Sequence, residues 1–188
     1  MIRKAAQRAK EEKESGDLKP PKANVAHLSA VMRVKKDLEH LDGIVVKLLS
    51  FNEQTLEMLL QYSPLYGIWQ GGTFDFRLVF PEDYPNGPPK LTYLGPTRMW
   101  HPNIEGDPGQ TEWGVCLSLL KIGVVEDGWT AVRQLRDVLF GLQLLFDENS
   151  INIDDPLPGT AKEAAQHLKN NPRDYVAKAK RWMQGNYR

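Results

Sequence analysis

The chain has 188 residues, 41% of them hydrophobic, and its formal net charge is zero. This length suits one domain, and the hydrophobic share is enough for a packed core. The neutral charge argues against a nucleic-acid partner, and the lack of an 18-residue apolar run argues against a membrane span. A single cysteine, with no apolar signal segment near the start, predicts a reducing compartment, the cytoplasm or the nucleus.

Residues 1–23 differ in composition from the rest of the chain. They contain seven basic and four acidic residues, two consecutive prolines and few large hydrophobic side chains. We therefore expect a flexible N-terminal extension at 1–23 and a folded core domain at 24–188. A docking segment for a partner, beginning with Met1 and Ile2, is the alternative interpretation of the extension.

The first helix is expected just after this extension. Apolar residues recur there at near-helical spacing over residues 25–41, and an Asp-Gly pair at 42–43 ends the pattern. Three basic residues lie within it, at Arg33, Lys35 and Lys36. They form either a solvated charged face or a docking surface, and the pattern fits both interpretations.

Four segments then have the apolar content and the turn boundaries of strands: 44–50, 56–62, 74–80 and 90–94. The third is the clearest, because apolar residues occupy every second position from 74 to 80, and one face is expected in the core. That face consists of Phe74, Phe76, Leu78 and Phe80. Short turns between sequential strands predict an antiparallel meander.

An apolar stripe from Val132 to Phe146 predicts the central helix of the fold. Thr130 is a suitable N-cap for it, and Gly141 lies at a position that permits close packing. The stripe follows the periodicity of an amphipathic helix more closely than any other segment.

Two C-terminal helices are expected after a turn at residues 154–159. Thr160 and Glu163 have the spacing of a capping box for the first of them, and Asn171-Pro172 marks the start of the second. Together these elements predict an α+β fold with an N-terminal helix, a four-stranded antiparallel meander sheet, a central helix and C-terminal helices.

Cys116 is the only cysteine, so it is a core side chain or a reactive thiol and not half of an internal disulfide. It follows a loop at 105–114, and a thiol at a loop exit can be exposed, as a nucleophile must be. His101-Pro102-Asn103 precedes this loop as a rigid turn that presents the Asn103 amide in a fixed direction. Such an amide either stabilises the oxyanion of an attacked thioester or forms hydrogen bonds with backbone groups of the turn.

These motifs resemble the signature of ubiquitin-conjugating enzymes, which combines His101-Pro102-Asn103, Cys116-Leu117 and Trp129. The likeness extends upstream to the proline-rich run at 80–90 and downstream to Asp154-Asp155-Pro156-Leu157. The ordered motifs cover most of residues 28–185. The long stretch between Cys116 and Trp129 makes the chain most similar to the neddylation-type members, which have an extended active-site loop.

The resemblance implies a thioester mechanism. Cys116 would carry the modifier, Asn103 would stabilise the oxyanion, and Asp155 would orient the attacking lysine and accept its proton. His101 and Pro102 would have the structural role in the active-site turn. The neighbouring Asp154 is the second candidate for this role. Alternatively, both carboxylates only stabilise the turn before Pro156.

The resemblance also implies four protein partners. They are a ubiquitin-like modifier (that of neddylation, alternatively ubiquitin), its activating enzyme, a RING-type ligase and a cullin-type substrate whose lysine is modified. The expected docking residues are Met1, Ile2, Arg33, Lys35, Lys36, Asn86, Trp129, Thr130 and Val132. No metal or other cofactor is expected, because the four histidines lie far apart and no Cys/His spacing suits zinc.

Two other classes of protein fit the motifs less well. A Cys–His protease is disfavoured, because no papain-like or caspase-like signature surrounds Cys116. A noncatalytic relative that serves as a binding module would lack the nucleophile, which this chain has. The chain departs from the family pattern by extra residues at 105–114 and 121–128. It also departs at Asn86 and at Thr130-Ala131, positions that face the ligase in the family.

Overall fold

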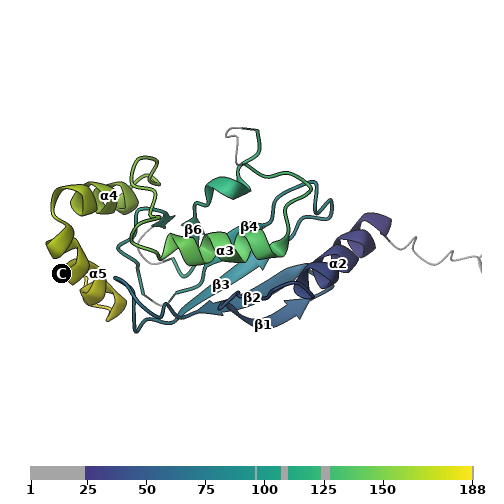
Figure 1. Ribbon diagram of the computed structural model, residues 1–188, viewed down its shortest axis with the longest axis horizontal. Coiled ribbons are helices and arrows are strands. Elements are labelled where there is room, and N and C mark those ends of the chain that lie inside the picture. The colour runs from purple at the N-terminus through teal and green to yellow at the C-terminus, as the bar shows by residue number, and fades with distance from the viewer. Residues whose placement is uncertain (1–23, 96, 107–109, 124–127, 188) are drawn as a thin grey trace, which may run out of the picture.

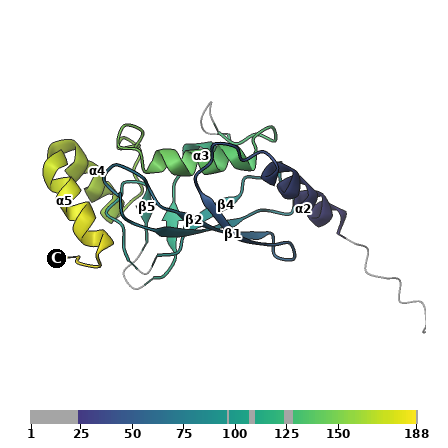
Figure 2. The ribbon, with the colours of Figure 1, turned by 60° about the horizontal axis from the view of Figure 1, so that its bottom comes forward.

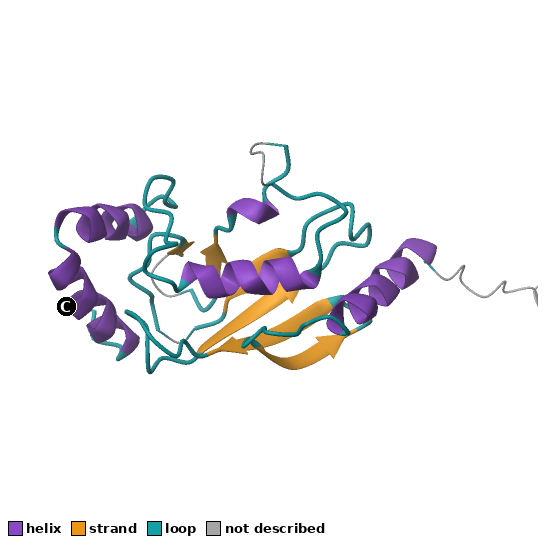
Figure 3. Ribbon diagram, viewed as in Figure 1, coloured by secondary structure: helices purple, strands orange, loops and turns teal. Residues whose placement is uncertain are grey.

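The computed structural model of the chain describes residues 24–95, 97–106, 110–123 and 128–187 (Figure 1). Helix α2 lies at one end of a sheet, helices α4 and α5 lie at the other end, and α3 runs across the sheet between them (Figure 3). The turned view shows α3 against one face of the sheet (Figure 2). The predicted α+β fold class is confirmed.

Helix α2 (Val25–Leu38) is the expected N-terminal helix. It begins where the Asn24 side chain accepts a hydrogen bond from the backbone N–H of His27 (3.4 Å). It ends three residues earlier than predicted, because the N–H groups of Glu39 and His40 bond to carbonyl groups three residues back and tighten the chain into a turn.

The four predicted strands are β1 (Lys47–Asn52), β2 (Glu57–Tyr62), β3 (Phe74–Val79) and β4 (Lys90–Tyr93). Consecutive strands pair antiparallel, which confirms the meander. On β3 the aromatic face is buried while the intervening Asp75 is exposed, as the alternation predicts.

Two short strands, which the sequence did not predict, extend this sheet from four strands to six among the described residues. They are β5 (Ile104–Glu105) and β6 (Trp113–Val115), and the strand order is β1-β2-β3-β4-β6-β5. Strands of two and three residues are too short to show a periodic pattern. Their pairing matters because it brings together the chain segments on which the predicted active-site residues lie.

The central helix, α3 (Leu135–Leu145), is confirmed, but its predicted start was wrong. Thr130 is not the N-cap: Gln134 is, and its backbone N–H donates to the Asp137 carboxylate (2.8 Å) in a capping box. Val132, which the sequence pattern placed in the buried stripe, lies outside the helix and is 84% exposed.

The backbone before α3 is held out of a helix by a side chain of α2. The Arg33 guanidinium donates to the carbonyl oxygens of Ala131 (3.3 Å) and Arg133 (2.7 Å). These carbonyl groups are thereby satisfied by a distant partner, and the segment forms a turn instead of a first helical turn. A contact over about a hundred residues of sequence leaves no local pattern by which it could be predicted.

Helices α4 (Thr160–Asn170) and α5 (Pro172–Met183) form the expected C-terminal pair. The predicted start of α5 is confirmed, since the Asn171 side chain accepts a hydrogen bond from the backbone N–H of Asp174 (3.3 Å). No helix in the described ranges has the length and apolar content to cross a membrane, and the His, Cys, Asp and Glu side chains there form no cluster of three suited to a metal.

The capping box predicted for α4 was wrong. Its N-cap is Gly159, whose φ of 73° suits a glycine, and Thr160 is the first residue of the helix. The Thr160 hydroxyl donates instead to the Glu105 carboxylate (2.6 Å), which also accepts from the backbone N–H of Ala161. Glu105 on β5 therefore caps α4 from outside, and this contact fixes the helix to the end of the sheet.

Candidate active site

The pairing of β5 with β6 places Asn103 beside Cys116. Ile104 lies opposite Val115 in this ladder, and the backbone N–H of Cys116 donates to the carbonyl oxygen of Asn103 (2.9 Å). Cys116 is half-buried, so its thiol is neither sealed in the core nor fully exposed. The sequence therefore identified two residues that the fold brings together, although twelve residues separate them in the chain.

The His101 ring is buried and holds the turn at 101–103 through two hydrogen bonds. It lies 4.7 Å from the Trp69 ring, centroid to centroid, and is completely buried. One ring nitrogen faces the carbonyl oxygen of Leu145 (2.9 Å) and the other faces the backbone N–H of Asn103 (2.9 Å). Because a carbonyl only accepts and an N–H only donates, Nε2 carries the proton and Nδ1 is the acceptor.

Burial lowers the pKa of His101 to about 4, so the ring is neutral near pH 7. Both ring nitrogens are also engaged in the hydrogen bonds that hold the turn. His101 is therefore not available as a base for the thiol of Cys116, which agrees with the structural role implied by the resemblance and disfavours a Cys–His protease.

The Asn103 side chain is 1% exposed and lies in the turn that His101 supports. Its Nδ2 donates to the carbonyl oxygen of Asn152 (3.1 Å), while its Oδ1 has no hydrogen-bond partner among the described residues. One of the two Nδ2 protons suffices for the bond to Asn152. The other has no acceptor among the described residues and is available to a second one. An unpaired buried Oδ1 is the kind of unsatisfied group that functional sites retain.

Asp155 lies in the loop that follows α3, with its side chain 65% exposed. The carboxylate accepts a hydrogen bond from the Lys121 ammonium, with a distance of 2.6 Å between Nζ and Oδ2. This bond, together with the charge interaction with Cys116, raises the pKa of Lys121. Thiol, ammonium and carboxylate are therefore neighbours in the folded chain.

Lys121 and Asn152 were not among the residues that the sequence identified. Lys121 follows the short 3₁₀ helix η1 (Ser118–Leu120). Asn152 lies in the loop after α3, and its side chain accepts a hydrogen bond from the backbone N–H of Asp155 (3.0 Å). Neither has a motif of its own. The only signal was proximity to Cys116 and to Asp155 in the chain, which is too common a feature to indicate function.

A hollow of about 290 Å³ opens at the thiol and is lined by residues of the turn, of η1 and of α3, among them Asn103, Cys116, Leu119, Gly141 and Leu144. Gly141 has the packing role that was predicted for it, because a Cβ there would lie 2.5 Å from Cδ2 of Leu119. The hollow gives an extended chain segment room to approach the sulfur.

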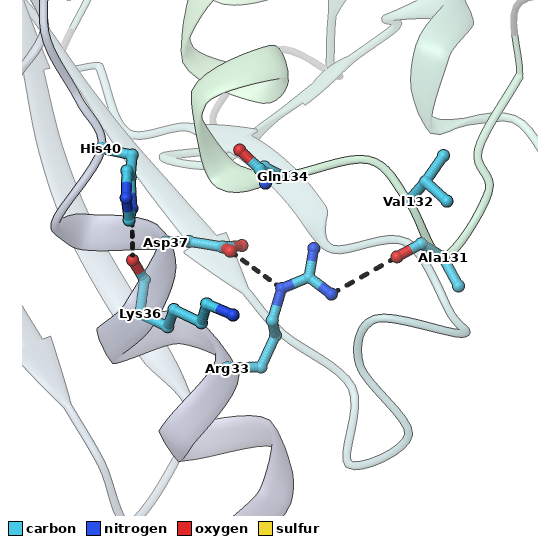
Figure 4. Close-up of a pocket in the computed structure, with 7 residues that line it drawn as sticks. All are labelled: Arg33, Lys36, Asp37, His40, Ala131, Val132 and Gln134. Atoms are coloured by element: carbon cyan, nitrogen blue, oxygen red, sulfur yellow. Dashed lines mark hydrogen bonds and ion pairs between the residues drawn. The ribbon is translucent and has the colours of Figure 1, made fainter.

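Several of the predicted docking residues form a separate surface at the junction of α2 and the turn before α3 (Figure 4). Arg33 lies between Asp37 of its own helix (2.8 Å) and the carbonyl of Ala131 (3.3 Å). Val132 projects beside them and is largely exposed, and Lys36 lines the same hollow. Figure 4 shows these groups around one depression.

The remaining residues that were predicted to dock partners do not line this hollow. Lys35 pairs with Glu53 (2.7 Å), and Asn86 and Thr130 are exposed. Trp129 is buried, and its indole N–H donates to the carbonyl oxygen of Pro85 (2.8 Å). This hydrogen bond holds the proline-rich run at 80–90 against the core.

Some sequence predictions fall on residues that the structure does not describe. Met1, Ile2 and the whole extension at 1–23 lie outside the described residues. The same is true of residues 107–109 and 124–127, which belong to the two stretches with extra residues.

Comparison with known proteins is consistent with this geometry. The family model described as "Ubiquitin-conjugating enzyme" matches residues 28–183. NEDD8-conjugating enzyme UBE2F of Homo sapiens is 41% identical over 118 residues, which are 62% of this chain and 57% of that protein. NEDD8-conjugating enzyme Ubc12 of Dictyostelium discoideum is 32% identical over 177 residues, which are 93% of this chain and 68% of that protein.

The fold of the chain is also similar to a solved structure of S. cerevisiae Ubc12. The TM-score is 0.64 at 26% identity, and the match covers 96% of this chain and 90% of that one. The chain spans 57–62% of the length of the UBE2F relatives it matches. The resemblance that the motifs indicated is confirmed by these comparisons.

Proposed function

Because the chain belongs to the ubiquitin-conjugating enzyme family, we propose that it carries a ubiquitin-like modifier as a thioester on Cys116 and transfers it to a lysine. The observation that carries this proposal is the hydrogen bond of 2.9 Å that holds Cys116 against Asn103 at the edge of an open hollow. A thiol, an amide donor and a carboxylate are the groups that acyl transfer between thioester and amine requires.

In the loading step, the Cys116 thiolate attacks the C-terminal carbonyl carbon of the modifier, which arrives as a thioester on its activating enzyme. The bond from this carbon to the sulfur of Cys116 forms, and the thiolate of the activating enzyme leaves. One thioester replaces another, so the step needs positioning and no strong base. The described site, in which His101 is neutral and fully engaged, suits this requirement.

In the discharge step, the neutral amine of a lysine attacks the same carbonyl carbon. The free Nδ2 proton of Asn103 stabilises the oxyanion, and the Asp155 carboxylate orients the amine and accepts its proton. Collapse of the tetrahedral intermediate expels the Cys116 thiolate and leaves an isopeptide bond. Asp155 suits this role because its backbone is fixed by Asn152 while its side chain is exposed.

We propose that the modifier is NEDD8 and that the lysine belongs to a cullin-type substrate, with an activating enzyme and a RING-type ligase as further partners. The names of the UBE2F and Ubc12 relatives support NEDD8. The surface of Arg33, Lys36 and Val132 supports docking of partner proteins, since exposed apolar and charged groups meet there. We place these reactions in the cytoplasm or the nucleus, where a free thiol stays reduced.

A thioester assay with two parallel reactions tests this proposal. The chain is mixed with the neddylation activating enzyme, NEDD8 and ATP, or with the ubiquitin activating enzyme, ubiquitin and ATP, at equal concentrations. Nonreducing gels should show faster charging with NEDD8. Preferential charging with ubiquitin would instead favour the alternative, a ubiquitin-conjugating enzyme with the same mechanism.

A further inference from the structure

A lysine ammonium of the chain itself already lies at the carboxylate proposed to receive the acceptor lysine. The Lys121 ammonium and the Asp155 carboxylate are 2.6 Å apart, measured from Nζ to Oδ2. Cys116 is the second group, after Asp155, that raises the pKa of Lys121, so the thiol is close to the same ammonium. An attacking lysine needs the same two neighbours, a carboxylate and the reacting sulfur.

We propose that Lys121 occupies the acceptor-amine position at Asp155, and that a substrate lysine must displace it before attack. The inference rests on the proposed function and adds to it a residue that determines how tightly an acceptor amine binds. Lys121 is a positioning residue in this scheme. Because its pKa is raised, it stays protonated near neutral pH and has no lone pair with which to attack the thioester itself.

The carboxylate keeps its place when Lys121 leaves it. The backbone N–H of Asp155 donates to Oδ1 of Asn152 (3.0 Å), and two residues later the N–H of Leu157 donates to the carbonyl oxygen of Pro102 (3.0 Å). The loop of Asp155 is thus fixed to the active-site turn by bonds that do not involve Lys121. Removal of the ammonium should free the carboxylate and leave its position unchanged.

The ammonium can move while the backbone of Lys121 stays fixed. The backbone N–H of Lys121 donates to the carbonyl oxygen of Ser118 (3.0 Å), and the backbone carbonyl oxygen of Lys121 accepts from the N–H of Trp129 (2.8 Å). The Lys121 side chain is 34% exposed and its Asp155 partner is 65% exposed, so the ion pair has access to solvent. An exposed ion pair of this kind is weak enough for another amine to displace.

The functional test is discharge of the charged Cys116 thioester to free lysine over a range of lysine concentrations, at constant ionic strength and without ligase. In Lys121→Met, which keeps the apolar stem, the KM for lysine should fall about two- to fivefold, the range expected for displacing an exposed ion pair, with little change in kcat. Lys121→Arg should behave as the wild type. Lys47→Met, on the exposed face of β1, is the charge-matched control and should also behave as the wild type.

The role of Asp155 is tested by repeating the comparison in an Asp155→Asn background, where Lys121→Met should have no further effect on the KM. An unchanged KM in Lys121→Met, or the same decrease in the Asp155→Asn background, would overturn the proposal. A purely structural role of Lys121 would change kcat and stability and would not depend on Asp155.

A measurement without any modifier separates this inference from the proposed function. An NMR titration of the Lys121 side-chain nitrogen should give a pKa above the ordinary lysine value, and Asp155→Asn should lower it. An ordinary pKa in the wild type would overturn the inference even if charging succeeds. Failure of the chain to charge with any modifier would contradict the proposed function, and the titration would still decide whether Lys121 holds Asp155.

Discussion

The backbone N–H of Cys116 donates to the carbonyl oxygen of Asn103 over 2.9 Å, so the proposed nucleophile and its amide neighbour are joined by main-chain atoms alone. Neither side chain takes part in this bond. A substitution at either position therefore keeps both atoms of this bond. Changes in chemistry can for this reason be measured separately from the strand pairing that creates the site.

Asn103→Ala should slow discharge much more than loading. The amide is proposed to stabilise the oxyanion formed when an amine attacks, and loss of one such donor costs about 10- to 1000-fold in rate. Single-turnover assays of the two steps, each started with a saturating reactant, give both rates. Asn170→Ala, at the exposed end of α4, is the matched control.

The main alternative is that Asn103 only supports the turn through its bond to the carbonyl oxygen of Asn152 (3.1 Å). Equal losses in loading and discharge, or a circular dichroism spectrum that differs from that of the wild type, would support this alternative and contradict the oxyanion role.

The neutral state of His101 should make stability depend on pH. Burial lowers the pKa of this ring from 6.5 to about 4, so between these values the unfolded chain binds more protons at this residue than the folded chain. The stabilisation is complete above pH 6.5 and is lost as the pH falls toward 4, by about 3 kcal/mol from this residue. Urea denaturation at several pH values should show this decrease.

NMR titration of the histidine ring protons measures the same effect directly, and the His101 ring should titrate near pH 4. His101→Gln, which keeps a donor toward Leu145, should flatten the decrease in the free energy of unfolding below pH 6.5. His40→Gln, at an exposed position, should retain it. A His101 ring that titrates near 6.5 would contradict the buried, neutral ring.

Asp37 should be important for stability because it joins three elements at one buried carboxylate. It is 4% exposed and accepts hydrogen bonds from Arg33 (2.8 Å), from the Tyr84 hydroxyl (2.6 Å) and from the backbone N–H of Leu135 (3.1 Å). Asp37→Asn should lower the free energy of unfolding by about 2–4 kcal/mol, because it leaves charged and polar groups poorly paired.

Tyr84→Phe removes only one of these hydrogen bonds and should cost about 1 kcal/mol. Asp42→Asn, at an exposed position after α2, should have almost no effect. Urea denaturation of the three variants gives the comparison. A loss in Asp37→Asn no larger than that in Asp42→Asn would show that the buried carboxylate does not hold α2 to the start of α3.

The elements that could be predicted from the sequence are those with a repeating local pattern. The alternation in β3 and the stripe of α3 each repeat often enough to identify the buried face, and Asn171-Pro172 has a local capping mechanism. The predicted start of α3 failed because its cause is Arg33, a side chain about a hundred residues away. The cap of α4 failed for the same reason, since Glu105 replaces Glu163.

The residues of the candidate site also divide into those with a local motif and those placed by distant contacts. Cys116, Asn103 and His101 belong to motifs with recognisable chemistry, and the structure places them together. Lys121 has no motif, and its contact with Asp155 spans 34 residues of sequence. Its effect on the carboxylate depends on how two loops lie relative to each other, which local patterns do not determine.

The central claim, a thioester on Cys116, is tested most directly by the adduct itself. The wild type is charged with NEDD8 in the presence of the activating enzyme and ATP, and is then examined by nonreducing gel and by mass spectrometry of the intact adduct. The adduct should vanish with a reducing thiol and should not form in Cys116→Ala, whose backbone hydrogen bond to Asn103 is retained. A thiol-sensitive adduct that persists in Cys116→Ala would contradict the mechanism.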